Sequence, residues 1–197
     1  MYVWRVSSDG KDVKCWLPKS SWDTFTPWTL SVTSSQLLVT SRDTKQLLIQ
    51  FDAVGDELRQ VDLPDDMEPL HAVESPTGTF IVRHYNTQLW QYQVSEVNTG
   101  GQVLCQFSGS CLLPFGQTLF ITQHVAVDSQ GNIFVADRYN GRILLLNSKL
   151  ALRRVIIDEH QLNYRGPVRL CYIEQTGLLL VGFQYGRDVA VFDVLRR

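Results

Sequence analysis

A short pattern recurs four times along the chain, and it constrains the fold more than any other feature of the sequence. Each copy starts at a small or turn-forming residue and continues as a strand-like run: SQLLVTS, GTFIVRH, GNIFVAD and GLLLVGF. The equivalent central valines are Val39, Val82, Val135 and Val181, which lie 43, 53 and 46 residues apart. A period of this length is typical of proteins built from one repeated supersecondary unit.

Further strand-like segments flank every copy of the pattern. A strand is expected before each copy, at 28–32, 70–74, 124–128 and 168–173. Third strands are expected after the copies, at 47–51, 89–92, 143–146 and 189–193, and fourth strands at 57–63, 102–107 and 151–157. These runs are rich in Val, Ile and Phe and are bounded by Gly, Asn and Asp, which favours strands over helices.

A four-stranded unit of about 47 residues cannot bury both of its faces alone, whereas units stacked radially can. The sequence therefore predicts an all-β fold, a β-propeller of four-stranded antiparallel blades with about four repeats. We expect a single domain over residues 1–197. Its whole blades are expected at approximately 28–66, 70–109 and 124–162, with partial blades at 1–18 and 168–197.

The strands expected at the two ends of the chain do not combine into one complete blade that would close a ring. MYVWRV followed by VKCWLP has the pattern of a third and a fourth strand, and the chain ends on a third strand, VAVFDV. Three arrangements stay open: an incomplete ring of a larger, six-bladed propeller, an unusually small ring, or an open array. Strand edges left exposed at both ends favour self-association through open blade edges.

The stretch HVAVDSQGNIFVADRYNGRILLL, from His124 to Leu146, shows the repeat most clearly. Asp128 and Asn132 flank Gly131 in a tight hairpin, where glycine provides a positive φ and aspartate caps the turn. Asp137 ends the next strand, and its short side chain is expected to accept hydrogen bonds from loop amides. These residues define the shape of a blade, and a purely architectural role for them stays open.

The sequence VAVDSQGNIFVAD followed by NGR resembles the NHL repeat family, and its period is in phase with all four repeats. The resemblance implies a propeller, commonly of six blades, which at this period needs about 280 residues. NHL arrays form the C-terminal ligand-binding part of tripartite-motif proteins. The resemblance therefore implies the substrate-recognition part of a ubiquitin-ligase-type protein, although no RING, B-box or long coiled coil is encoded in this sequence.

Successive connections in an antiparallel blade alternate between its two ends, so the turns between second and third strands gather on one rim. Tyr and Arg are frequent in these turns, and both are common anchors in protein interfaces. We therefore predict a partner-binding site formed by Arg42, Tyr85, Arg138, Tyr139, Asn140, Arg142, Tyr185 and Arg187. The longer connectors at 108–123 and 158–166 are expected on the same rim. A non-enzymatic interaction module with a protein partner is the favoured function.

Single-stranded RNA is an alternative ligand, because Tyr and Arg also stack on bases and contact phosphates. Residues 1–136 contain 8 Lys and Arg against 14 Asp and Glu, whereas residues 137–197 contain 10 against 6. RNA would therefore bind the basic C-terminal blades, a function that the NHL resemblance permits. The rim turns are mixed in charge, so a protein partner ranks above RNA, and DNA binding is not expected.

A metal-dependent lactonase or lyase is a third hypothesis, because propellers that resemble this one include such enzymes. They need several Glu, Asp, Asn or His ligands that converge in the central channel. His71 and His124 fall at the starts of inner strands and form the best candidate pair, although a satisfied polar residue at a strand end is the simpler interpretation. Asp158, Glu159 and His160 are a poor chelate, since neighbouring strand residues point to opposite faces. We predict no catalytic residue, metal or cofactor.

The cysteines Cys15, Cys105, Cys111 and Cys171 lack the CxxC spacing of zinc sites. Cys15 and Cys105 follow strand-like VxC patterns, which predicts buried thiols that act as small apolar residues. Apolar runs are far shorter than the ~20 residues of a membrane helix. The start of the sequence lacks the features of a signal peptide. A cytoplasmic protein without membrane contact is therefore expected.

Overall fold

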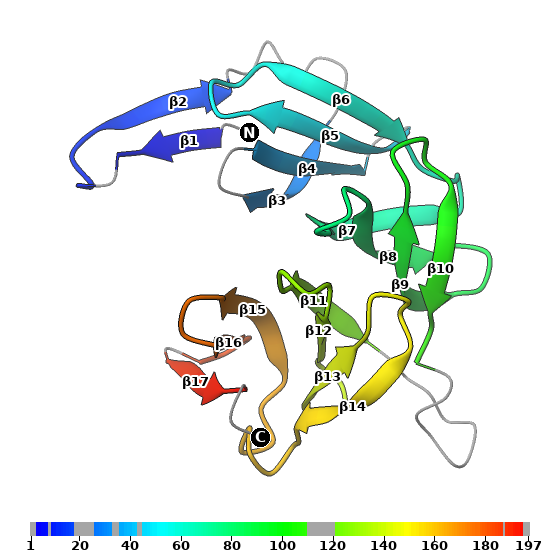
Figure 1. The fold of residues 1–197 in the computed structure, drawn as a ribbon, viewed down its shortest axis with the longest axis vertical. Helices are drawn as coiled ribbons and strands as arrows, with labels where there is room; N and C mark the ends of the chain where they lie inside the picture. The colour runs from blue at the N-terminus through cyan, green and yellow to red at the C-terminus, as the bar shows by residue number, and fades with distance from the viewer. Residues whose placement is uncertain are drawn as a thin grey trace.

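The computed structural model of this chain describes residues 3–7, 9–17, 26–32, 36–42, 45–109, 121–186 and 188–194. Within these ranges all regular secondary structure is β-strand, arranged in five antiparallel sheets. Figure 1 shows four of the sheets arranged around a common centre as the blades of a propeller. The predicted all-β propeller is thus confirmed. Among the described residues, no helix is long and apolar enough to cross a membrane.

Three blades have four strands each. The first contains β3 (Pro27–Val32), β4 (Gln36–Arg42), β5 (Gln46–Asp52) and β6 (Glu57–Asp62). The second contains β7 (Met67–Glu74), β8 (Phe80–Asn86), β9 (Gln91–Val97) and β10 (Val103–Phe107). The third contains β11 (Thr122–Val127), β12 (Ile133–Asp137), β13 (Arg142–Leu146) and β14 (Leu152–Ile157). In each blade the strands pair in chain order, and the first strand lies nearest the centre (Figure 1).

The remaining strands form two smaller sheets. The fourth blade has three strands, β15 (Pro167–Ile173), β16 (Leu178–Phe183) and β17 (Val189–Asp193). The hairpin formed by β1 (Val3–Val6) and β2 (Val13–Leu17) pairs only with itself. In Figure 1 the hairpin and β17 lie on either side of an opening in the ring of blades. The chain therefore forms an arc of four blades with a hairpin at its start.

The four repeat valines occupy equivalent places in the second strand of each blade. Val39, Val82, Val135 and Val181 are all completely buried. The residues just before Val82 and Val135 point to the opposite face of the sheet, so β8 and β12 each contribute to two interblade cores. This explains why the repeat sequences are apolar at successive positions, as is typical of strands covered on both faces.

Each pair of neighbouring blades shares one hydrophobic core. Leu38 and Leu48 of the first blade pack with Phe80 and Val82 of the second. Ile81 and Val94 on the other face of the second blade pack with residues of the third. The third and fourth blades are joined by Phe134, Ile143, Leu170, Leu179 and Val181, which pack in one cluster. The arc is therefore held together mainly by apolar contacts between the faces of successive sheets, since the described strands of different blades do not pair with one another.

Two expectations from the sequence are wrong in detail. The third strand of the second blade begins at Gln91, because Trp90 has a φ of 57° and belongs to the turn. The Cys15 thiol is exposed and Cys105 is only half-buried, so these two cysteines are not the buried apolar residues that were expected. Cys171 is also exposed, and Cys111 lies outside the described residues.

Candidate binding groove between the third and fourth blades

The hairpin between β11 and β12 is shaped by Asp128. Its Oδ1 accepts hydrogen bonds from the backbone amides of Gln130 at 3.0 Å and Asn132 at 2.7 Å, and its Oδ2 accepts one from Asn132 Nδ2 at 2.7 Å. Gly131 has a φ of 76°, a conformation that favours glycine. The predicted hairpin is confirmed, and it forms the turn between the two inner strands of the third blade.

The opposite end of β12 is held by Asp137, which is fully buried. Its carboxylate accepts hydrogen bonds from Asn140 Nδ2 at 2.9 and 3.0 Å and from Arg142 Nε at 2.8 Å. The backbone of Asn140 also donates to this carboxylate, so the expected hydrogen bond from a loop amide is present beside those from the side chains of the turn. Burial raises the pKa of Asp137, and the hydrogen bonds from Arg142 and Asn140 oppose that effect. The turn Arg138–Gly141 is therefore fixed to the blade by a buried charged contact.

The connector from β14 to β15 folds into a compact turn beside this first turn. The Asp158 carboxylate accepts from the Gln161 amide at 2.9 Å, and the Gln161 side chain accepts from the Asp158 amide at 3.1 Å. Leu162 is fully buried and anchors the connector in the core. Asn163 and Tyr164 have φ values of 51° and 58°, so the backbone turns sharply there. The Tyr164 hydroxyl lies 2.6 Å from His160 Nδ1.

Arg165 is fixed by contacts with the fourth blade. Its Nη1 donates to both carboxylate oxygens of Asp188, at 2.9 and 2.7 Å. Its guanidinium carbon lies 3.8 Å from the centre of the Phe183 ring, a distance typical of a cation–π contact. The hydrogen bond from Arg165 lowers the pKa of Asp188. Arg165 therefore presents an oriented guanidinium whose charge is largely balanced.

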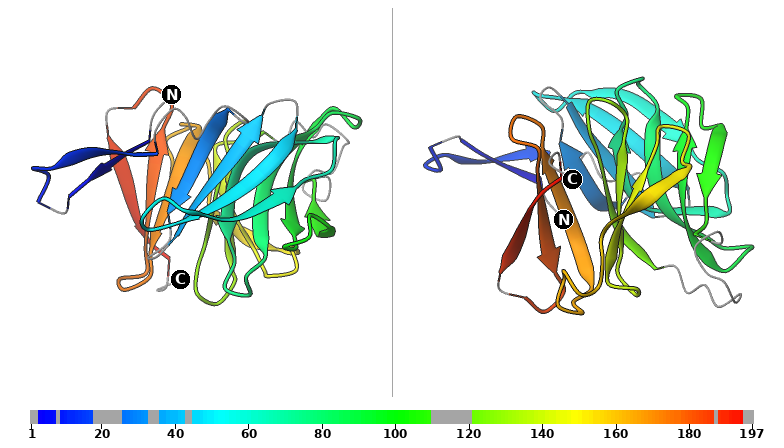
Figure 2. Two further views of the ribbon diagram at one scale, coloured as in Figure 1. Left: turned by 90° about the horizontal axis from the view of Figure 1, so that it is seen from above. Right: turned by 60° about the horizontal axis from the view of Figure 1, so that its bottom comes forward.

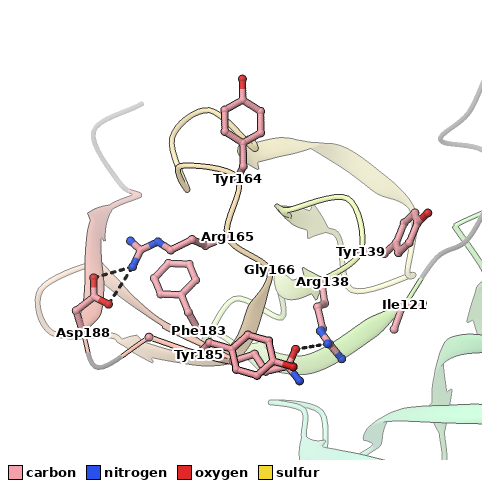
Figure 3. A pocket seen from close by; sticks show the side chains of 11 residues that line it. Ile121, Arg138, Tyr139, Tyr164, Arg165, Gly166, Phe183, Tyr185 and Asp188 are labelled. Carbon is pink, nitrogen blue, oxygen red and sulfur yellow. Dashed lines mark hydrogen bonds and ion pairs between the residues drawn. The ribbon is translucent and has the colours of Figure 1, made fainter.

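Arg138 lies on the other side of the same surface, where it donates a hydrogen bond to the Gln184 side chain (Figure 3). Gly166 passes close beneath it. A Cβ atom at Gly166 would lie 2.9 Å from both the Arg138 Cγ and its carbonyl oxygen. The absence of a side chain at Gly166 thus allows the β14–β15 connector to lie against the β12–β13 turn.

These three connections enclose a groove at the seam of the third and fourth blades. Its volume is about 780 Å³. The groove is lined by Ile121, Arg138, Tyr139, Tyr164, Arg165, Gly166, Phe183, Gln184, Tyr185, Gly186 and Asp188. Three of its tyrosines are strongly exposed: Tyr139 at 64%, Tyr164 at 70% and Tyr185 at 91%. Figure 3 shows these rings spaced around the fixed Arg138 and Arg165 side chains.

Residues 123–144, which form most of β11 through β13, match the family model for the NHL repeat. This protein is a β-propeller that contains an NHL repeat. The matched segment includes the Asp128 hairpin and the Asp137 turn, and it therefore contains Arg138 and Tyr139 of the groove.

Several solved structures are similar to this propeller. Virginiamycin B lyase from Staphylococcus aureus is 14% identical, with a TM-score of 0.59 over 97% of this chain and 62% of its own. A gluconolactonase from Xanthomonas campestris is 11% identical, with a TM-score of 0.62 over 91% and 61%. A protein of unknown function from Bacteroides caccae is 15% identical, with a TM-score of 0.55 over 86% and 57%.

Likeness at these identities shows the fold alone. The NHL-repeat propeller spans about three fifths of the length of these structures. Comparison with curated proteins gave no match.

The eight residues predicted as a binding site of the propeller are not all brought together. Arg138, Tyr139 and Tyr185 line the groove. Asn140 and Arg142 belong to the same turn, but their side chains contact the buried Asp137. Tyr85 lies in the second blade and packs against Tyr92, with 5.2 Å between the ring centres. The Arg42 side chain and the whole of Arg187 lie outside the described residues. A binding role for each of the eight stays a prediction.

Sequence reasoning missed several residues that line the groove. It placed the 158–166 connector on the correct rim but did not single out Tyr164 or Arg165. The adjacent Tyr and Arg in that connector carried the same signal as the Arg–Tyr pair at 138–139. Phe183 and Asp188 had no such signal, because their importance depends on contact with Arg165 from another blade.

The paired histidines of the inner strands of the NHL-repeat propeller lie together, as expected. The rings of His71 and His124 stack with 3.9 Å between their centres. Burial lowers the pKa of His71 to about 4, and the charge of Arg83 adds to that effect. Arg83 Nε donates to the Thr122 carbonyl at 2.7 Å. Within the described part of the chain, no three His, Cys, Asp or Glu side chains are grouped as a metal would require.

Proposed function

We propose that this propeller binds a protein partner in the groove between its third and fourth blades and that it acts without catalysing a reaction. One observation carries the proposal: three exposed tyrosines surround a cavity that also contains two oriented arginines. Tyr and Arg are the side chains most often found as binding anchors. A groove of this volume accommodates a few residues of an extended peptide.

The chemistry of the groove favours a peptide over a polyanion. Arg165 is paired with Asp188, so its guanidinium contributes little net charge. Arg138 remains half-buried and oriented by Gln184, where it can donate hydrogen bonds to carbonyl or carboxylate oxygens of a ligand. Tyrosine rings add contact area at a small cost in conformational entropy, since each has only two rotatable side-chain bonds.

The resemblance of the repeat to the NHL arrays of tripartite-motif proteins extends the proposal. In this interpretation the propeller is the substrate-recognition part of a ubiquitin-ligase-type assembly. The groove selects the substrate, and the RING function is supplied by another segment or another chain. This part of the proposal rests on the family match over residues 123–144.

Selection of a peptide from a displayed random library against the wild-type propeller tests the groove directly. The affinity of the selected peptide is then measured for Tyr139→Ala and Tyr185→Ala, each of which is expected to weaken binding about tenfold. Trp90→Ala is the matched control, because Trp90 is 79% exposed in the equivalent turn of the second blade. It is expected to bind the peptide like the wild type.

Two results would contradict this function. The first is an unchanged affinity in both tyrosine variants, which would place the peptide elsewhere. The second is tight binding of a single-stranded oligouridine whose affinity falls steeply as salt rises, since that dependence is typical of phosphate contacts. A measurable peptide affinity combined with weak, salt-independent RNA binding supports the proposal.

A further inference from the structure

The two arginines of the groove differ in how their charges are balanced. Arg165 donates to both carboxylate oxygens of Asp188 and lies over the Phe183 ring. Among the described residues, Arg138 donates only to the uncharged Gln184 side chain, and no carboxylate pairs with it. A guanidinium has several N–H donors, so most of those of Arg138 can still bind a ligand. The groove therefore contains one arginine whose charge has no partner in the described part of the chain.

The acidic residues close to Arg138 in the sequence and across the groove are already engaged. Asp137 is buried and hydrogen-bonded within its own turn. Asp188 is paired with Arg165 at 2.7 Å. Glu159, on the neighbouring connector, does not line the groove. The charged side chains that line it are thus two cations against one carboxylate, which leaves an excess of one positive charge.

A basic ligand would find the places that recognise a cation already occupied. Such places are an aromatic face and a carboxylate, and Arg165 uses both the Phe183 ring, at 3.8 Å from its guanidinium carbon, and the Asp188 carboxylate. Arg138 would in addition repel an incoming cation, since like charges brought together disfavour a wrong partner. Charge complementarity in the groove therefore favours an acidic ligand over a basic one.

Arg138 is also held in a defined orientation. Its side chain is half-buried and packs against Gly166, where a Cβ atom would lie 2.9 Å from the Arg138 Cγ. Gln184 accepts a hydrogen bond from its guanidinium. Figure 3 shows Arg138 and the Arg165–Asp188 pair on opposite sides of the groove. An arginine fixed in this way loses little conformational freedom when its planar guanidinium binds both oxygens of a carboxylate.

We infer that the peptide bound in the groove is acidic and that one of its carboxylates pairs with Arg138. This inference rests on the proposed function, because it names the chemistry of the ligand of the same groove. The carboxylate belongs to an Asp or Glu side chain or to the C-terminus of the peptide, and in either case a single negative charge matches the single uncompensated cation. Peptide residues beside this carboxylate then pack on the exposed rings of Tyr139 and Tyr185.

The charge of the surrounding chain agrees with an acidic ligand. The third and fourth blades pack against each other and lie side by side in Figure 2. Residues 137–197, which form the fourth blade and most of the third, contain 10 Lys and Arg against 6 Asp and Glu. A basic surface of this kind attracts an acidic ligand before contact is made, and the Arg138 guanidinium then provides the specific contact.

Neutral versions of the selected library peptide test the inference. The peptide is synthesised with one carboxylate removed at a time, by exchange of Asp for Asn or Glu for Gln or by amidation of the C-terminus. One of these changes is expected to weaken binding to the wild-type propeller about tenfold, as the loss of a hydrogen bond between charged groups does. The change that has this effect identifies the source of the carboxylate. Because these peptides are measured on the wild-type protein, the result does not depend on the folding of a variant.

Two variants place the carboxylate in the groove. In Arg138→Gln the acidic peptide and its neutral version are expected to bind with equal affinity, because the partner of the carboxylate is gone. Arg153→Gln is the matched control, since it removes the same charge from an exposed position of β14 that does not line the groove. The tenfold preference for the acidic peptide should persist in this control.

The outcomes separate this inference from the function on which it rests. A peptide that needs Tyr139 and Tyr185 but tolerates removal of every carboxylate would overturn the inference and leave the proposed function intact. A preference for the acidic peptide that persists in Arg138→Gln, or that is lost in Arg153→Gln, would overturn it as well. A peptide that binds both tyrosine variants like the wild type would overturn the proposed function and this inference with it.

Discussion

At the scale of single residues, the buried carboxylate of Asp137 has the largest effect on the shape of the candidate site. Burial opposes its ionisation, and three hydrogen bonds from Asn140 and Arg142 compensate. The turn that carries Arg138 and Tyr139 is held in place by these bonds. Since Arg142 is itself mostly buried, the loss of Asp137 would leave an uncompensated cation in the blade.

Asp137→Ala is therefore expected to lower the free energy of unfolding by about 3 kcal/mol, a typical result of removing one partner of a buried ion pair. The measurement is urea denaturation followed by intrinsic fluorescence. Asp188→Ala is the comparison, because its carboxylate is exposed and its pair with Arg165 lies at the surface. Stability close to the wild type is expected for that variant. Equal losses in the two variants would show that burial of the Asp137 carboxylate is not the decisive factor.

Stability should also depend on pH through the buried histidines. His84 is fully buried, and burial lowers its pKa from 6.5 to about 4. Between these values the unfolded chain binds a proton that the folded chain does not, so the stabilising effect is complete above pH 6.5 and is lost as the pH falls towards 4. His84 alone accounts for roughly 3 kcal/mol over this window.

Urea denaturation at intervals from pH 7 to pH 4 measures this dependence. His84→Gln removes the titrating group but retains an amide that can donate to Ser95 Oγ, which lies 2.8 Å from His84 Nε2. The variant is expected to lose less stability over the acidic window than the wild type, whatever its stability at pH 7. Parallel pH profiles for the two proteins would rule out His84 as a source of the acid sensitivity.

Local residues of the site were predictable where their partners are close in sequence. Asp128 and Gly131 shape a hairpin whose hydrogen bonds span at most four residues, so the sequence was sufficient. Arg165 is held by Asp188, which is 23 residues away on another connection. No local pattern encodes a contact of that kind, which explains why Asp188 was missed.

At the scale of secondary-structure elements, β12 and β16 have similar sequences but differ in burial. Both contain an uninterrupted apolar run, IFVA and LLLV. All five residues of β12 are buried, whereas those of β16 alternate between half-buried and buried. The sequence of β16 is therefore suited to cover on both faces, but only the face towards the third blade is covered. The mismatch between sequence and burial locates the open end of the arc.

Strand positions were predicted well because period-two patterns and turn residues agree along most of the chain. The second blade shows the limit of this approach. Leu89 and Trp90 look like strand residues by composition, yet Asn86 Oδ1 accepts hydrogen bonds from the amides of Gln88 and Leu89 and fixes a turn there. Aromatic and aliphatic side chains in an exposed turn are not distinguishable from a strand by composition alone.

The connection between the β12–β13 turn and the β14–β15 connector depends on close approach at Gly166. Gly166→Ala is expected to weaken binding of the selected peptide about tenfold and to lower the melting temperature, because the added Cβ would displace both the side chain and the backbone carbonyl of Arg138. Gly100→Ala is the control, since its Cβ would meet only the Asn98 side chain at 3.4 Å. An unchanged peptide affinity in Gly166→Ala would show that the ligand does not depend on the seam.

At the scale of the whole molecule, the repeat period was sufficient to predict radial sheets but not their closure. Each repeat specifies one blade with two apolar faces, and that information is local to about 47 residues. Whether the arc closes depends on the contact between its first and last sheets. That contact joins residues from opposite ends of the chain, and no repeat unit encodes it. For this reason the sequence leaves three arrangements open: an incomplete ring of a larger propeller, a small ring, and an open array.

The arc also predicts a gradient of local stability, because its blades differ in how completely they are covered. β8 is buried at six of seven positions and β12 at all five, whereas β17 has no buried residue and the β1–β2 hairpin pairs only with itself. Local opening requires less free energy where fewer apolar contacts are broken. Amide hydrogens should therefore exchange fastest in the hairpin, next in β17, and slowest in β8 and β12.

Hydrogen exchange followed by mass spectrometry measures this order. Uniform exchange across the blades would instead show that the propeller opens as one cooperative unit, with its ends as strongly held as its centre.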